Sequence, residues 1–333
     1  MRKPQHLSPT SLNQFYKDQQ EYYLMYLADR RPPRFPQTQP MSVGSSFDAY
    51  AKSFLHERIF GAGSDPKFEF DAIFTAQVEE QNRDWARVAG KHVFDEYKRS
   101  GALAGLLLDL QKAIGKPRFE LEVKGAINGY REGVTLEIGD VTFLGKPDVA
   151  YINKFGANVI LDWKVNGYCA PRNTSPMQGY VRLREDGSNK GQHRNAQLMS
   201  HKGVMINVAG HLEDFDEDWA IQLGIYGWLC GMDIGSDFIV AIDQVVAKAA
   251  QPRPLLRFAE HRLRISSDFQ WRTFAKAQQA WAIINSDHFF RDMSYEDSKA
   301  RCLALDGIAD AVKGDGSEND DWFAKVTREQ KPW

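Results

Sequence analysis

Two aspartates and a lysine in the middle of the chain have the types and spacing of a metal-dependent hydrolytic centre. Asp148 follows Gly145-Lys146-Pro147, and further along the chain Asp162 and Lys164 follow an apolar run, Val159-Ile160-Leu161. Hard divalent cations prefer carboxylate oxygens, and a nearby ammonium can orient water or stabilise negative charge on a phosphate. The three residues predict a divalent-metal site for phosphodiester hydrolysis, provided that the fold brings them together.

The elements around these residues predict a β-hairpin that does so. Residues 141–152 and 157–165 are rich in β-branched and aromatic types, and the segment between them, Asn153-Lys154-Phe155-Gly156, has turn-forming residues at both ends. Folding about this turn places Asp148 nearly opposite Asp162. Because side chains alternate along a strand, the lysine two positions further on shares a face with the second aspartate.

An acid-x-lysine triplet is not specific by itself. Other triplets of this kind start at Asp65, Glu96, Glu122, Asp297 and Glu329. On an exposed strand such a triplet is usually a solvated face. Asp162 differs because it follows an apolar run typical of a buried strand, where a charged side chain is costly unless it is paired or bound to metal.

Together with its flanking motifs, the hairpin resembles the PD-(D/E)XK nuclease superfamily, in particular its RecB-like exonuclease branch. Segments 8–16 and 22–27 resemble the opening helix of that family, and Gln222-Leu223-Gly224-Ile225-Tyr226 resembles its Gln-x-x-x-Tyr motif. The resemblance implies an α/β fold with a restriction-endonuclease-like core. In that core a central mixed β-sheet is flanked by helices, and an N-terminal helical addition packs beside it.

The same resemblance assigns roles to five residues. Asp148 and Asp162 are implied to be metal ligands, and Lys164 is implied to be the catalytic lysine. Gln222 and Tyr226 are implied to line the site from a helix, and since they lie four residues apart they share a face of it. The alternative for these last two is an ordinary place at the edge of the core.

Three further acidic residues are candidate metal ligands. Asp48 follows Val43-Gly44-Ser45-Ser46-Phe47, where many relatives have a metal-binding histidine. Aspartate also coordinates Mg²⁺ or Mn²⁺, and the alternative is that Asp48 caps a helix. Glu120 and Glu122 lie on a predicted strand at 118–128, where relatives often carry an acid, although a half-exposed strand explains them as well. The expected cofactor is Mg²⁺ or Mn²⁺.

Cysteine usage and composition limit the remaining classes of protein. Some relatives hold an iron–sulfur cluster with four cysteines, whereas this chain has only Cys169, Cys230 and Cys302, so no such cluster is expected. The chain has 333 residues, of which 43% are hydrophobic and 26% charged, and no apolar run reaches membrane-spanning length. We expect no membrane partner and a reducing compartment, the cytoplasm of a bacterium or of a host cell if a virus encodes the protein.

The net charge of −2 does not by itself indicate nucleic-acid binding. A locally basic segment beside the acidic site does fit contact with a phosphate backbone, and the alternative is a solvated loop. Its candidate DNA contacts are Arg172, Arg182, Arg184, Lys190, Arg194 and Lys202.

Three regions are expected along the chain. Residues 1–117 would be a helical region that packs on the core. Residues 118–312 would be the nuclease core, with a long loop at about 166–215. Residues 313–333 would be a flexible tail.

The sequence favours a Mg²⁺- or Mn²⁺-dependent deoxyribonuclease, specifically an exonuclease, acting in DNA recombination or repair. A compact chain of this kind suits a virus or a mobile element. One alternative is a structure-specific endonuclease that uses the same site. Another is a catalytically silent nuclease-like module that binds DNA or a protein. A recombination partner protein or a homo-oligomer is compatible with each of these, and no residue selects between them.

Overall fold

The structure is a computed structural model that describes residues 2–29, 36–120, 122–127, 130–131, 134–135, 141–166, 198–201, 204–208, 210–248 and 255–286. The chain forms two compact units. The smaller unit comprises Met1–Pro4, Gln14–Pro36 and Ile283–Trp333, and the larger unit comprises Gln5–Asn13 and Gln37–Ala282. All the described candidate site residues belong to the larger unit.

The secondary structure alternates helical and extended segments. The helices are α1 (Pro9–Lys17), α2 (Gln19–Tyr22), a π-helix (Tyr23–Leu27), α3 (Gln39–Phe60), α4 (Phe70–Gln77), α5 (Arg83–Arg99), α6 (Ala102–Gln111), α7 (Glu217–Leu229) and α8 (Ser267–Asn285), with 3₁₀ turns at Pro66–Phe68, Glu80–Asn82 and Leu212–Asp214. The strands are β1 (Ile114–Phe119), β2 (Val123–Ile127), β3 (Tyr130–Arg131), β4 (Val134–Thr135), β5 (Val141–Gly145), β6 (Val149–Ile152), β7 (Asn158–Asn166), β8 (Leu198–His201), β9 (Val204–Asn207), β10 (Ile239–Lys248) and β11 (Leu255–Leu263).

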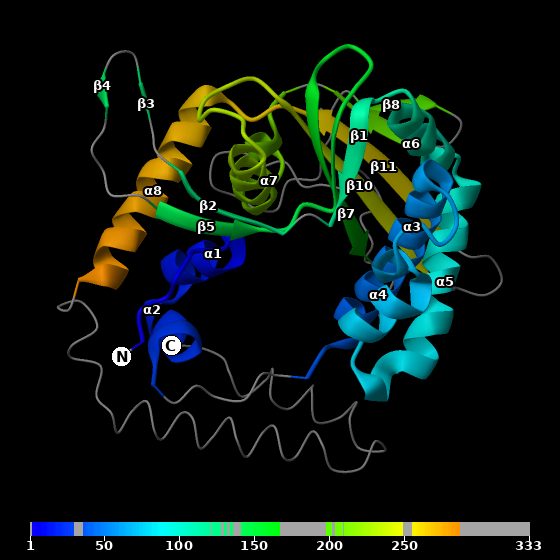
Figure 1. Cartoon of the computed structure of the whole chain (residues 1–333), viewed down its shortest axis with the longest axis horizontal. Helices are drawn as coiled ribbons and strands as arrows, with labels where there is room; N and C mark the ends of the chain where they lie inside the picture. The colour runs from blue at the N-terminus through cyan, green and yellow to red at the C-terminus, as the bar shows by residue number, and fades with distance from the viewer. Residues whose placement is uncertain are drawn as a thin grey trace. The chain divides into compact units, whose positions relative to one another are not determined.

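A mixed β-sheet forms the centre of the larger unit (Figure 1). Its seven strands lie in the order β1-β6-β7-β10-β11-β9-β8. β7 runs parallel to β10 and β11 runs parallel to β9, whereas the other neighbouring pairs are antiparallel. The larger unit therefore has an α/β fold with a mixed sheet flanked by helices, which confirms the coarse fold prediction.

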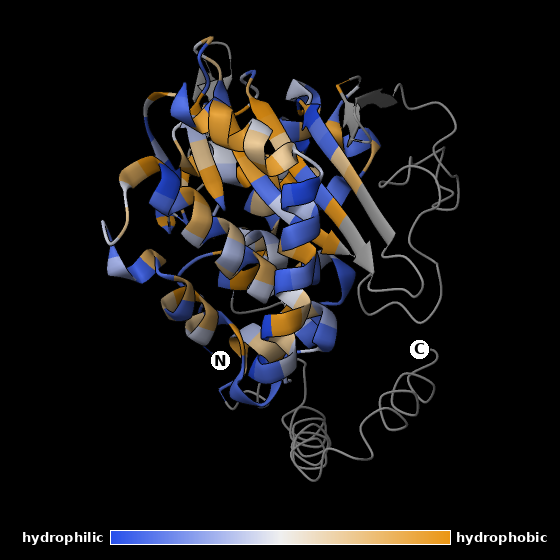
Figure 2. Ribbon diagram, turned by 90° about the vertical axis from the view of Figure 1, so that its right-hand side faces the viewer, coloured by the Kyte–Doolittle hydropathy of each residue, from blue (hydrophilic) through white to orange (hydrophobic). Residues whose placement is uncertain are grey.

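Helices cover both faces of this sheet. α3 and α5 pack on one face, where Phe47, Tyr97 and Trp163 meet at edge-to-face angles in the core. α7 contacts β7 from the opposite face (Figure 1). The apolar colour in Figure 2 runs along the strands, as expected for a sheet that is buried on both sides. Residues of β7 that alternate in sequence thus face different helices.

The predicted hairpin is confirmed about its turn, but its first arm, 141–152, is divided into β5 and β6, and only β6 pairs with β7. β6 and β7 pair antiparallel with Val149 opposite Leu161, which is the register expected from the turn. In that turn the side-chain oxygen of Asn153 accepts hydrogen bonds from the backbone N–H groups of Phe155 and Ala157, each at 3.0 Å. An asparagine at the start of a tight turn commonly satisfies the backbone in this way.

Two other local predictions differ from the structure. The strand expected at 118–128 is divided into β1 and β2, and the break falls at Glu120, whose φ of 47° lies in the left-handed region. Part of the loop expected at 166–215 instead forms β8 and β9. This hairpin extends the sheet because Val204–Asn207 pairs with Phe258–His261 of β11.

The described part of the smaller unit is built around a π-helix, Tyr23–Leu27. The backbone N–H of Arg2 donates a hydrogen bond of 2.7 Å to the carbonyl of Leu27, and the rings of Tyr22 and Tyr26 lie 4.8 Å apart. No helix in the described residues of either unit is long and apolar enough to cross a membrane. The predicted tail, 313–333, lies outside the described residues.

Candidate active site

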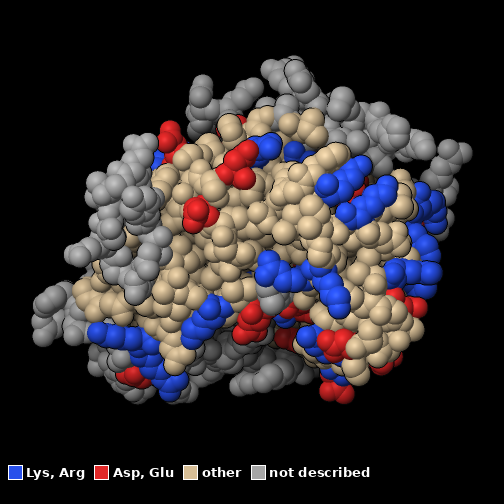
Figure 3. Space-filling view, turned by 45° about the horizontal axis from the view of Figure 1, so that its top comes forward, with Lys and Arg blue, Asp and Glu red and all other residues tan. Residues whose placement is uncertain are grey.

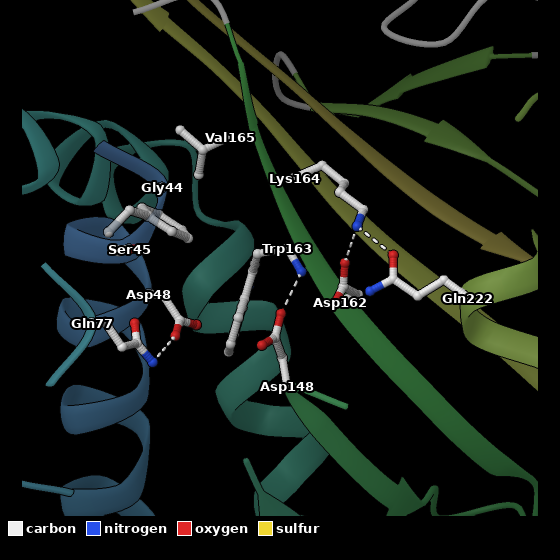
Figure 4. A pocket seen from close by; sticks show the side chains of 11 residues that line it. Gly44, Ser45, Asp48, Gln77, Asp148, Asp162, Trp163, Lys164, Val165 and Gln222 are labelled. Carbon is white, nitrogen blue, oxygen red and sulfur yellow. Dashed lines mark hydrogen bonds and ion pairs between the residues drawn. The ribbon is translucent and has the colours of Figure 1, made fainter. Parts of the chain in front are cut away.

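A pocket of about 270 Å³ opens beside β7, between α3 and α7. Figure 4 shows Lys164, Asp162 and Gln222 directed toward one another on one side of this pocket, with Asp48 on the other side and Asp148 between them. A water molecule occupies roughly 30 Å³ in the liquid. The pocket therefore has room for a phosphate group together with several waters.

Lys164 is held by contacts from two elements. Its ammonium lies 2.5 Å from Asp162 Oδ2 and donates a hydrogen bond of 2.8 Å to Gln222 Oε1. The amide of Gln222 donates in turn to the hydroxyl of Tyr226 at 3.0 Å. The structure thus brings four of the predicted catalytic residues into one continuous chain of polar contacts. The Trp219 ring, which the sequence did not single out, lies 5.9 Å from the same ammonium.

The close approach of α7 to β5 depends on a glycine of the sequence motif. A Cβ atom at Gly145 would lie 2.6 Å from the side chain of Leu229 and 2.7 Å from the ring of Tyr226. Only a residue without a side chain lets the helix pack this closely against the strand. Gly145 therefore helps to position the Gln222–Tyr226 face of α7 beside the hairpin.

Asp148 lies directly before β6 and is shared between two donors. Its Oδ2 accepts a hydrogen bond of 3.0 Å from the backbone N–H of Trp163, and its Oδ1 lies 2.9 Å from the ammonium of Lys52. Lys52 is only 2% exposed and also lies 2.7 Å from Asp48 Oδ2. Asp48 sits well inside α3, which begins at Gln39, so the capping alternative is wrong.

The two competing glutamates have different environments. Glu120 Oε1 lies 2.5 Å from Lys146 and 3.9 Å from Lys52, so it joins the acidic cluster. Gln77 donates hydrogen bonds of 3.0 Å both to this oxygen and to Asp48 Oδ2. Neither glutamate lines the pocket itself, and Glu122 is exposed. Between these glutamates, the structure places Glu120 beside the predicted site.

Two of these polar side chains, Lys52 and Gln77, were not predicted from the sequence. Lys52 had a signal, because it lies one helical turn after Asp48 and an acid-to-lysine spacing of four favours an ion pair. Gln77 had none, because its partners are distant in sequence and meet only through the packing of α4 against α3.

Burial strongly perturbs the acidic groups. Desolvation raises the pKa of Asp162 to about 7, with Asp148 adding to the rise and Lys164 opposing it. Desolvation likewise raises the pKa of Asp48 to about 6, although the nearby Lys52 counteracts it. Burial alone would also raise the pKa of Asp148. The ammonium of Lys52 and the hydrogen bond from the Trp163 N–H outweigh this effect, so the pKa of Asp148 is lowered. Negative charge is thus concentrated on Asp148, between two carboxyls that resist ionisation.

Opposing effects keep both buried lysines charged. Desolvation alone would lower the pKa of Lys52, but Asp148 and Asp48 raise it above its ordinary value. The same balance, dominated by Asp162, raises the pKa of Lys164. Both ammonium groups are therefore protonated at neutral pH.

The donor types fit a hard divalent cation. Asp48 Oδ1 is buried and has no hydrogen-bond partner in the described part of the chain, and Asp162 is 5% exposed. Buried carboxylate oxygens of this kind are suitable ligands for Mg²⁺ or Mn²⁺. Within the described residues, however, no three acidic, histidine or cysteine side chains converge closely enough to enclose an ion as they stand.

A buried polar network supports Trp163, the residue between Asp162 and Lys164. Its indole N–H lies 3.3 Å from the hydroxyl of Tyr97, which donates a hydrogen bond of 2.5 Å to Asp243. Asp243 is 0% exposed and lies 2.7 Å from the guanidinium of Arg262. The network fixes the core side of β7 directly behind the pocket.

The basic residues predicted to contact DNA cannot be placed in this arrangement. All six lie outside the described residues: Arg172, Arg182, Arg184, Lys190, Arg194 and Lys202. On the face shown in Figure 3, basic and acidic side chains are interspersed, and Lys and Arg form several separate groups. This face therefore does not present a field of one sign.

No protein-family model matches the sequence, and no curated protein matches it. Among solved structures, the chain is similar to one described as "Crystal structure of SSO0001", with 9% sequence identity and a TM-score of 0.24. The match covers 86% of this chain and 95% of that one. A TM-score this low carries no conclusion about fold or function.

Proposed function

We propose that the protein is a Mg²⁺- or Mn²⁺-dependent deoxyribonuclease of the PD-(D/E)XK superfamily, in its RecB-like branch, and that its sheet is a restriction-endonuclease-like core. One observation carries the proposal. The ammonium of Lys164 is held between Asp162 and Gln222 in a pocket that also receives Asp148. This combination of two carboxylates and a fixed ammonium suits hydrolysis of a phosphodiester bond.

In this proposal Lys164 acts as a fixed positive charge. Its raised pKa makes it a poor proton acceptor at neutral pH, so its task is to orient the attacking water and to stabilise negative charge that develops on the phosphate. Gln222 keeps the ammonium in place through its hydrogen bond of 2.8 Å, and Tyr226 orients the amide of Gln222. These two residues position the lysine.

Asp148 and Asp162 are the residues that would hold the metal ion, with Asp48 and Glu120 beside them. A bound Mg²⁺ or Mn²⁺ would polarise the scissile phosphate and lower the pKa of a water ligand. Asp162 also pairs with Lys164. Asp162 therefore links the position of the Lys164 ammonium to the carboxylates that would hold the metal ion.

Among nucleases, an exonuclease that acts on linear DNA is the first candidate. A structure-specific endonuclease would use the same residues, and cutting of closed circular DNA distinguishes it. One observation favours a third candidate, a silent nuclease-like module that binds DNA or a protein. Lys52 already forms ion pairs with Asp48 and Asp148, two of the carboxylates that a metal would need.

The decisive experiment compares wild type with Lys164→Ala on end-labelled linear DNA with Mg²⁺ or Mn²⁺. Loss of a preorganised charge of this kind lowers the rate of cleavage by roughly 10²–10³-fold. Lys154→Ala is the matched control, because Lys154 is an exposed lysine at the tip of the same hairpin. Absence of cleavage by wild type in either metal, or equal rates for Lys164→Ala, would refute the enzymatic proposal. DNA binding that persists in EDTA without cleavage would instead support the silent module.

A further inference from the structure

Lys52 occupies a position that is unusual for a lysine. Its side chain is almost completely buried, and its ammonium lies 2.7 Å from Asp48 Oδ2, 2.9 Å from Asp148 Oδ1 and 3.9 Å from Glu120 Oε1. An ammonium has three N–H donors and no acceptor. Surrounded by three carboxylates, this one takes the place that a cation would take.

The charges of the cluster support the same view. Four carboxylates and three ammonium groups meet here, so the formal charge is −1 when all are ionised: Asp48, Glu120, Asp148 and Asp162 against Lys52, Lys146 and Lys164. One divalent ion would reverse this sign to +1, and a second would raise it to +3. In a buried site a surplus of like charge is strongly unfavourable. With two ions bound, removal of the Lys52 ammonium lowers the formal charge from +3 to +2, so Lys52 opposes the binding of a second ion.

We propose that Lys52 is a resident cation that takes the place of a second metal ion, so that the protein binds a single divalent ion at the Asp148–Asp162 end. The inference rests on the proposed function. Two-metal hydrolytic sites hold their ions about 3.5–4 Å apart around shared carboxylates. Here Asp148 is the shared carboxylate: Lys52 lies 2.9 Å from its Oδ1, and Asp162 is its carboxyl neighbour in the pocket.

The acidic side chains of the site are paired with two different ammonium groups. Lys52 holds Asp48 and Asp148, whereas Lys164 holds Asp162, so the acidic groups are divided between two ammonium groups. An ammonium supplies charge but no coordination bond. Lys52 is thus a positioning residue that fixes Asp148 and screens the charge of Asp48. Its presence determines how many divalent ions the site binds.

The test is the number of Mn²⁺ ions bound per chain, measured on the full-length protein by the electron paramagnetic resonance signal of free Mn²⁺. Wild type is expected to bind one ion, and Lys52→Met is expected to bind two. Lys52→Arg keeps the charge and should bind one. Lys146→Met is the matched control, because it removes one ammonium from the same cluster but leaves the Asp48–Asp148 pair occupied, and it should also bind one.

Each outcome separates the two proposals. Two ions on wild type, or one ion on Lys52→Met, overturns the role of Lys52 and leaves the nuclease proposal intact. No ion on wild type removes the metal-dependent function and this inference with it. If Lys52→Met is unfolded without metal, the inference requires Mn²⁺ to restore its far-ultraviolet circular dichroism with a stoichiometry of two. Failure of that recovery also overturns it.

Discussion

Lys164 Nζ donates a hydrogen bond of 2.8 Å to Gln222 Oε1, which joins β7 to α7 across 58 positions of the sequence. The same ammonium lies 2.5 Å from Asp162 on its own strand. Its position is therefore fixed from both elements, and the geometry of the candidate site depends on α7 as much as on the hairpin.

Gln222→Leu removes the contact from α7 and leaves Lys164 with Asp162 alone. Because a hydrogen bond to a charged group contributes about 1.5–3 kcal/mol, we expect the single-turnover cleavage rate to fall by roughly 10–100-fold. Tyr226→Phe is the matched variant, since it removes only the hydroxyl that orients Gln222. Its effect should be smaller. A rate for Gln222→Leu equal to wild type would show that α7 does not position the lysine.

The metal-free protein should lose stability as the pH rises through the neutral range. Asp162 has a pKa of about 7 in the folded state against an ordinary value of 3.8. Between these values the folded state binds more protons than the unfolded state, so the free energy of unfolding falls with increasing pH and the loss is complete above the folded pKa. Each pKa unit corresponds to about 1.4 kcal/mol.

Thermal denaturation in EDTA at about pH 5 and about pH 7.5 measures this loss. Asp162→Asn is the control, because it cannot ionise and should show a smaller decrease in Tm between the two pH values. Mn²⁺ should restore stability at the higher pH, where the carboxylate is ionised and free to bind. Identical pH profiles for wild type and Asp162→Asn would contradict the raised pKa.

Gly145→Ala should disturb the packing of α7 against β5. The added Cβ would meet Leu229 at 2.6 Å and Tyr226 at 2.7 Å, and overpacking of this kind costs about 1–3 kcal/mol. Gly125→Ala on the neighbouring strand is the matched control, since its Cβ would have its nearest neighbour at 3.9 Å. Chemical denaturation compares the two. Equal free energies of unfolding for both variants would rule out the proposed close contact.

Tyr97→Phe should destabilise the core behind the pocket. It removes the hydroxyl that donates to the fully buried Asp243 and lies near the indole N–H of Trp163. Leaving buried polar groups without this partner costs about 1–3 kcal/mol. Tyr50→Phe removes an exposed hydroxyl that reaches the Arg87 carbonyl only at 3.4 Å, so it should have little effect. Urea unfolding of the two variants provides the measurement, and equal stability would argue against the buried network.

The hairpin could be predicted from the sequence because it depends on short segments of neighbouring residues. The turn at Asn153 and the alternation of side chains on β7 are properties of short segments, and they were sufficient to bring Asp148 toward Asp162. The Gln222–Tyr226 face was also predictable, because helical periodicity places residues four apart on one side. Its place beside the site was implied by the resemblance, and the structure supplies the contact with Lys164.

The choice between Glu120 and Glu122 could not be made from the sequence. Both alternate along what looked like one continuous strand, but the chain breaks at Glu120 with a positive φ, and only Glu120 joins the acidic cluster. A positive φ at a residue other than glycine is stabilised by its tertiary surroundings, since local propensity disfavours it.

The sequence by itself determined which strand carries the paired acid and lysine and on which face they lie, because both follow from the two-residue period of a β-strand. Only the tertiary structure decided what surrounds them. Lys52 meets Asp148, and Gln77 meets both Asp48 and Glu120, through the packing of α3 and α4 beside the hairpin. Contacts between elements far apart in sequence depend on how whole faces pack, and no short pattern of residues encodes them.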